Sequence, residues 1–170
     1  MRRAGEPSIA VLGMGNLIYS DDGAGLRALW RLDKDPRLPR QVELVDGSGS
    51  GLPLVSRLAG AERLLILDAV YIGAPPGAVV RLGEEDLRGL SGGAHVHELG
   101  IPDLISALRL MGRMPRETVL LGIQAESVAL GTELSPAVES GLGRLVSESL
   151  RLLAEWTGDA SRLESPAAEA

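Results

Sequence analysis

The sequence contains no cysteine, which excludes disulfide bonds, thiolate metal sites and cysteine nucleophiles. It also has no phenylalanine, and aromatic residues make up only 2% of the chain, so we expect an aliphatic core and no platform for stacking nucleic-acid bases. Basic residues are in deficit, with 17 Lys and Arg against 23 Asp and Glu, for a formal net charge of −6. That balance argues against nucleic acid or an anionic membrane as a partner, because both attract a basic surface.

Long apolar runs are missing as well. No segment is apolar for the roughly 18 residues that a membrane-spanning helix requires, and the apolar stretch at 9–12 is too short for a secretory signal. We therefore expect a cytoplasmic protein. The length of 170 residues predicts a single α/β domain over 1–156, followed by a flexible tail over 157–170 whose small and charged side chains show no period.

Short apolar runs alternate with helical patterns along the chain. The runs predict five buried strands, at residues 8–12, 41–45, 63–67, 78–82 and 117–123. Helical spacing of apolar residues predicts helices at 22–33, 52–60 and 101–111 and a long last helix after Ser135. This alternation is typical of an α/β domain with a largely parallel sheet and helices on both faces. No helix of useful length precedes the run at 78–82, so we expect that strand to be antiparallel and at an edge.

Polar side chains with metal-binding or catalytic potential follow the predicted strands. Asp21 and Asp22 follow the first strand, Asp46 the second and Asp68 the third, while His97 precedes the helix that leads to the fifth strand. Ligands of open α/β sheets bind beyond the carboxyl ends of the parallel strands, so these residues are the candidate site. Two carboxylates and one imidazole, without sulfur, suit a divalent ion such as Ni²⁺, Zn²⁺ or Mn²⁺.

Some of these residues have simpler interpretations. Acidic residues at a helix start interact favourably with the helix dipole, by about 0.3–1 kcal/mol, so helix capping alone would explain Asp21 and Asp22. His97, taken alone, needs no ligand to account for it. Asp68 is different, because an Asp directly after a buried apolar run is rarely buried without a partner.

The glycine-rich segment 13–16 (GMGN) follows a strand and precedes a helix, as in dinucleotide-binding proteins. The third glycine of that motif is absent, and Ile18 stands in its place. Asp21 and Asp22 would also repel a phosphate at the helix N-terminus. A nucleotide-binding module is therefore the weaker hypothesis.

Four segments, in order along the chain, resemble those of the hydrogenase maturation endopeptidases. The first two are GMGNL at 13–17 with SDDGAG at 20–25, and LDAV at 67–70 with Gly73 and Pro76-Gly77. The other two are HELGI at 97–101 with Asp103, Leu104 and Gly112, and GIQ at 122–124 with Glu126, Leu134, Ser135 and Val138. The resemblance extends over about residues 9–150, and the order of the segments makes it specific.

This resemblance implies an endopeptidase that removes the C-terminal extension of a [NiFe]-hydrogenase large-subunit precursor after nickel insertion. It implies a three-layer αβα sandwich around a mixed five-stranded sheet, in the order 2-1-3-5-4 with strand 4 antiparallel. The family's metal ligands fall on Asp22, Asp68 and His97, which would recognise nickel supplied by the substrate. Other divalent ions also suit these ligands.

Two positions depart from the family pattern. The segment after Asp46 reads Gly47-Ser48-Gly49 where the family often has Gly-Gly-Thr, which leaves the catalytic role of Asp46 open. His95 stands where a small polar residue is usual, and we expect His97 to be the ligand and His95 an exposed loop residue. Hydrolysis would use either a metal-polarised water or carbonyl, or Asp46 as general base. A non-catalytic chaperone that binds the nickel protein is the alternative function.

Overall fold

The computed structural model describes residues 8–49, 52–89 and 100–159. Its elements follow one another in the order β1 (Ile9–Gly13), the 3-10 turn η1 (Ser20–Gly23), α1 (Ala24–Asp33), β2 (Val42–Asp46), α2 (Leu52–Leu58), β3 (Arg63–Val70), β4 (Val79–Leu82), α3 (Glu84–Gly89), α4 (Ile101–Leu110), β5 (Glu117–Gln124) and α5 (Pro136–Thr157). Within the described ranges, no helix is long and apolar enough to cross a membrane.

The five strands form one mixed sheet in the order β2-β1-β3-β5-β4. The strands β1, β2, β3 and β5 are parallel, and β4 runs antiparallel to β5 at the edge. The predicted order and the predicted antiparallel edge strand are both confirmed. The reversal of β4 has a simple cause, because residues 71–78 are too few for the crossover that a parallel strand requires.

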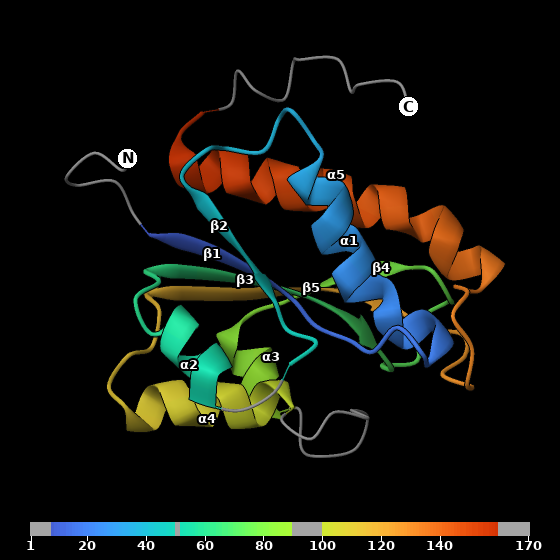
Figure 1. Cartoon of the computed structure of the whole chain (residues 1–170), viewed down its shortest axis with the longest axis horizontal. Helices are drawn as coiled ribbons and strands as arrows, with labels where there is room; N and C mark the ends of the chain where they lie inside the picture. The colour runs from blue at the N-terminus through green and yellow to red at the C-terminus, as the bar shows by residue number, and fades with distance from the viewer. Residues whose placement is uncertain (1–7, 50–51, 90–99, 160–170) are drawn as a thin grey trace.

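Helices cover both faces of the sheet, which gives three layers (Figure 1). The helices α1 and α5 pack on one face, and α2, α3 and α4 pack on the other. Alternation along β3 assigns its side chains to these layers: Leu65 and Leu67 face α1 and α5, whereas Leu64, Ile66 and Val70 face α4. The buried core of the described residues is aliphatic, as predicted, apart from Trp156.

Two element boundaries differ from the predictions in ways that affect the candidate site. The first helix begins at Ala24 rather than Asp22, because residues 20–23 form a separate 3-10 turn. The third strand continues to Val70, so Asp68 lies inside β3, paired with Gly122 of β5, rather than after the strand. The last helix ends at Thr157, and nearly all of the tail predicted over 157–170 lies outside the described residues.

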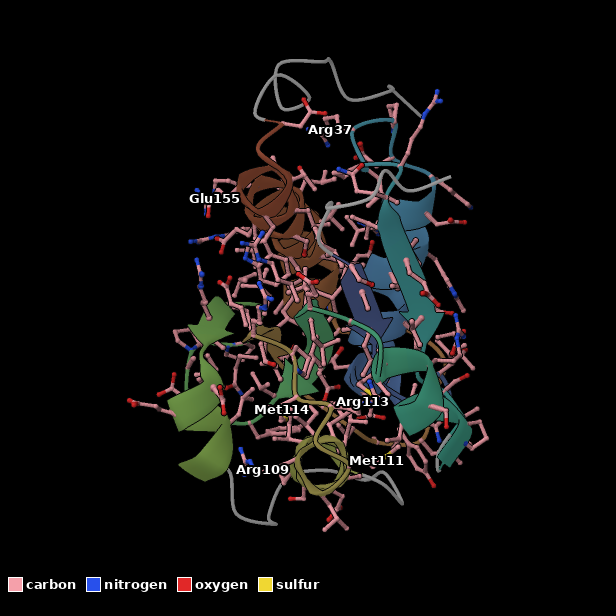
Figure 2. All side chains as sticks on the ribbon, turned by 90° about the vertical axis from the view of Figure 1, so that its left-hand side faces the viewer. Arg37, Arg109, Met111, Arg113, Met114 and Glu155 are labelled. Atoms are coloured by element: carbon pink, nitrogen blue, oxygen red, sulfur yellow. The ribbon has the colours of Figure 1, made fainter. Side chains whose placement is uncertain are left out.

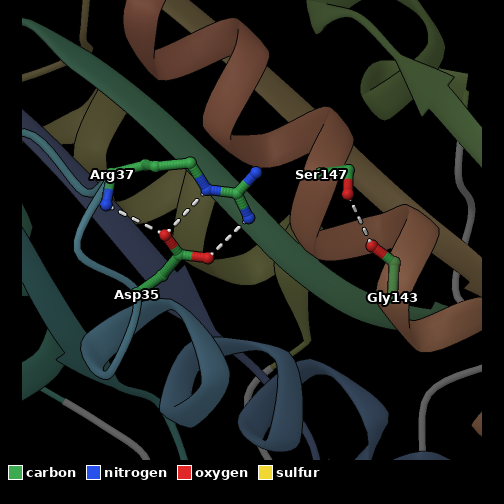
Figure 3. Close-up of polar contacts among 4 residues, drawn as sticks. All are labelled: Asp35, Arg37, Gly143 and Ser147. Carbon is green, nitrogen blue, oxygen red and sulfur yellow. Dashed lines mark hydrogen bonds and ion pairs between the residues drawn. The ribbon is translucent and has the colours of Figure 1, made fainter. Parts of the chain in front are cut away.

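An ion pair closes the turn after α1 (Figure 3). The Arg37 backbone N–H and Nε–H both donate to Oδ1 of Asp35 at 2.9 Å, and Nη2 donates to Oδ2 at 2.7 Å. The side-chain hydrogen bond is the main reason that the pKa of Asp35 is lowered and the pKa of Arg37 is raised. The turn also brings Leu38 against the core under α1 and α5.

We expect Asp35→Asn to lower the free energy of unfolding at pH 7 by about 1–2 kcal/mol, because charge-assisted hydrogen bonds are lost. The pKa of Asp35 is lower in the folded protein, so its stabilisation is present above the unfolded pKa and is lost as pH falls through the folded pKa. Urea unfolding at pH values from 7 down to 3 or below should show the difference between wild type and variant shrinking. A difference that stays constant with pH would contradict this account.

Candidate active site

Glycines are required in and near the first loop because the backbone there packs closely against other backbone atoms. Gly15 has a φ of 132°, and a Cβ atom there would lie 2.0 Å from the carbonyl oxygen of Asp22. A Cβ atom at Gly25 would lie 2.3 Å from the carbonyl oxygen of Leu67, where α1 starts against β3. Packing therefore explains these glycines without a bound phosphate, and the loop is wrapped closely around Asp22.

Asp22 is buried at the turn between the first loop and α1, with 5% of its surface exposed. Its Oδ2 accepts a hydrogen bond of 2.8 Å from the backbone N–H of Asn16, six residues earlier. The N-cap residue of α1 is Gly23, and no side chain caps the helix. Helix capping therefore does not explain Asp22, whose carboxylate is turned toward the first loop at the carboxyl end of β1.

Asp21 has a different role from its neighbour, because its carboxylate ties two distant loops together. The side chain is fully buried and accepts hydrogen bonds from the backbone N–H groups of Glu126 at 2.9 Å and Ser127 at 3.0 Å. Ser135 adds two more, from its backbone N–H at 2.6 Å and its hydroxyl at 2.8 Å. Asp21 thus anchors the segment between β5 and α5 to the turn that carries Asp22.

We expect Asp21→Ala to lower the free energy of unfolding by about 3 kcal/mol, since the change leaves buried N–H donors without their charged acceptor. Asp33→Ala is the matched control, because Asp33 is an exposed acid on the next helix and its loss should change stability by less than about 0.5 kcal/mol. Urea unfolding of both variants measures the difference. Equal stability of Asp21→Ala and wild type would show that these hydrogen bonds do not hold the loops.

Asp68 lies in the central strand β3 and is 1% exposed. Its Oδ1 accepts a hydrogen bond of 2.8 Å from the backbone N–H of Ala69. By alternation Asp68 shares a side of the sheet with Ile66 and Val70, which is the side that α4 covers. The turn η1 contacts β3, so the structure brings Asp22 and Asp68 to the same end of the sheet.

Asp46 is the exposed last residue of β2, and its Oδ1 accepts a hydrogen bond of 2.8 Å from the Ser48 N–H. The strand β1 separates it from β3, and Gly13 pairs with both Asp46 and Leu67. Two strand spacings of about 4.8 Å therefore place the Cα atoms of Asp46 and Leu67 about 10 Å apart. Alternation with Leu44 directs Asp46 toward the α1 side of the sheet, opposite to Asp68.

The two predicted histidine positions, His97 and His95, lie outside the described residues. Within the described part of the chain, no group of three or more His, Asp or Glu side chains could hold a metal ion. The predicted third ligand, His97, precedes the N-cap residue Gly100 of α4 by three positions.

The sequence patterns predict no role for Tyr71 and Gln124, which also lie at this end of the sheet. Partial burial raises the pKa of Tyr71, whose side chain is 40% exposed, and the negative charges of Asp21 and Asp22 add to the effect. Gln124 is buried, and its Oε1 accepts hydrogen bonds from the N–H groups of Ile72 at 3.0 Å and Ala74 at 3.2 Å. The one available signal for Tyr71 was its position just past the buried run that ends in Asp68.

Comparison with known proteins points to one family. The family model described as hydrogenase maturation protease matches residues 26–152. Hydrogenase expression/formation protein HupD of Bradyrhizobium diazoefficiens is 34% identical over 164 residues, which cover 95% of this chain and 85% of that protein.

Solved structures agree with the sequence relatives. The hydrogenase maturating endopeptidase HybD from Escherichia coli superposes with a TM-score of 0.80 at 33% identity, covering 86% of this chain and 92% of that one. The [NiFe] hydrogenase maturation protease HybD from Thermococcus kodakarensis gives a TM-score of 0.70 at 28% identity, covering 85% of this chain and 98% of that one. With the family model matching more than half of its length, the chain belongs to the hydrogenase maturation proteases, a family of endopeptidases.

Proposed function

We propose that this protease acts in the cytoplasm and removes the C-terminal extension of a [NiFe]-hydrogenase large-subunit precursor after nickel has been inserted. The observation that carries the proposal is the pair of buried carboxylates, Asp22 and Asp68, at the carboxyl end of the parallel strands of a hydrogenase maturation protease. The name of the structural relative from Thermococcus kodakarensis supports the link to a [NiFe] hydrogenase.

The proposed recognition element is the nickel ion already held by the precursor, bound by Asp22, Asp68 and His97. The donor chemistry fits, since carboxylate oxygens and an imidazole nitrogen are ligands that divalent ions such as Ni²⁺ accept. Three protein ligands leave coordination positions for the groups with which the precursor holds its nickel.

Two routes to peptide hydrolysis fit these residues. In the first, the substrate's nickel, bound by Asp22, Asp68 and His97, would position the scissile peptide and polarise its carbonyl or an attacking water. In the second, the metal serves recognition alone, and Asp46 takes a proton from the water. We favour the first route, because Asp46 is exposed, lies a strand away from β3 and already accepts the Ser48 N–H.

The test is incubation of the purified protein with a nickel-loaded large-subunit precursor, followed by intact-mass spectrometry. Loss of the C-terminal extension, with water added across a single peptide bond, is the expected result. A precursor that is bound but stays at full length would identify a maturation chaperone instead. A precursor that is neither bound nor shortened would contradict the proposed function.

A further inference from the structure

Exposed apolar side chains gather at one end of the sheet. The described residues include seven large hydrophobic side chains that are exposed, and four of them lie in the loops beyond the carboxyl ends of β1, β3 and β5. These four form what we call the apolar rim: Ile18 (51% exposed), Tyr71 (40%), Ile72 (44%) and Leu130 (79%). More than half of these exposed apolar side chains therefore lie at the end of the sheet where Asp22 and Asp68 lie.

Backbone pairing holds two members of the rim side by side. Tyr19 and Gly131 form an isolated parallel bridge between the first loop and the segment that follows β5. The Gly131 N–H donates to the carbonyl of Ile18 at 2.9 Å, and the Ser20 N–H donates to the carbonyl of Gly131 at 2.8 Å. Ile18 and Leu130 therefore stand on neighbouring stretches of backbone, although the sequence separates them widely.

The other two members are fixed by β5. The side chain of Gln124 accepts from the N–H of Ile72, and the Ala125 N–H donates to the carbonyl of Val70 at 3.0 Å. Tyr71 directly follows β3, three residues after Asp68, which connects the rim to the candidate active site. The three loops are thus held together before any partner arrives, and a preformed surface binds with a smaller entropic cost.

We propose that the apolar rim docks an apolar segment of the hydrogenase large-subunit precursor beside the peptide bond to be cut. This inference rests on the proposed function, and it assigns recognition of the polypeptide to residues other than those that would meet the nickel. A second copy of the chain fits the rim less well, because it would cover the end of the sheet that the precursor must reach. Two chains that each carry a net charge of −6 would also repel one another.

The double variant Ile18→Ser/Leu130→Ser tests the proposal on the nickel-loaded precursor. We expect its KM to rise about tenfold or more with kcat little changed, since uniform binding of the substrate is lost. Leu110→Ser is the matched control. Leu110 is 90% exposed and is the last residue of α4, next to Met111, which lies at the end of the molecule that faces the viewer in Figure 2, where the parallel strands begin. Its KM should equal that of wild type.

The outcomes separate this inference from the proposed function. In one outcome, wild type cleaves the precursor while the double variant and Ile72→Ser, a change in the loop after β3, both keep the wild-type KM. That result would overturn the docking surface and leave the proposed function intact. Precursor binding is measured in parallel on the same proteins, so the docking surface can be tested even if wild type does not cut. Equal precursor binding by wild type and the double variant would overturn the docking surface, and so would the absence of binding by wild type. If wild type is a dimer and the double variant is a monomer, the rim binds a second copy of the chain, and the proposed docking of the precursor is overturned. Thermal melts equal to wild type exclude misfolding.

Discussion

Asp68→Asn is expected to reduce cleavage of the nickel-loaded precursor more than about 100-fold while the protein stays folded, because a proposed nickel ligand loses its charge. The replacement has nearly the same shape, so β3 keeps its packing, and removal of a buried charge can even stabilise the protein. Asp22→Asn and His97→Ala should have the same effect on cleavage. Intact-mass assays and thermal melts of the three variants measure activity and folding separately.

Two control variants distinguish loss of a proposed nickel ligand from loss of a nearby acid or histidine. Asp46→Asn should retain most of the activity, because Asp46 is exposed and lies on the other side of β1 from Asp68. We expect the same of His95→Ala. Full activity in Asp68→Asn would contradict the assigned site, whereas an Asp46→Asn variant as inactive as Asp68→Asn would favour a carboxylate as general base.

Local sequence patterns were sufficient for the strands, the helices and the antiparallel edge strand, because apolar period and connection length decide these features. They placed the end of β3 too early. The strand continues through Asp68 to Val70 because β5 offers Gly122 and the residues after it as pairing partners. That extension comes from a strand some fifty residues away, so no local pattern reveals it.

The two adjacent acids of the first loop show the same limit. The sequence allowed helix capping for both Asp21 and Asp22, yet neither caps α1. Asp21 instead accepts hydrogen bonds from backbone groups at 126, 127 and 135, which only the folded chain brings near. The apolar rim was equally hidden, since it depends on the bridge between Tyr19 and Gly131.

A precursor that lacks nickel is expected to remain uncut. The proposed ligands Asp22, Asp68 and His97 are few and contain no thiolate, so they should hold a free ion less tightly than a closed four-ligand site does. The nickel of the precursor, already carrying ligands of its own, would complete the coordination and place the scissile bond. Matched nickel-free and nickel-loaded precursors, assayed at low free metal, should therefore differ by at least about 100-fold in cleavage rate.

The protease itself should not need the metal to fold, because aliphatic clusters on both faces of the sheet supply its core. Its melting temperature should be the same with and without a chelator, which shows that any loss of cleavage comes from the substrate. Docking on the apolar rim uses no metal, so the nickel-free precursor should still bind there, more weakly and without being cut. Equal cutting of both precursors would show that substrate nickel is not the recognition element, and would direct attention to a metal carried by the enzyme or to catalysis by carboxylates alone.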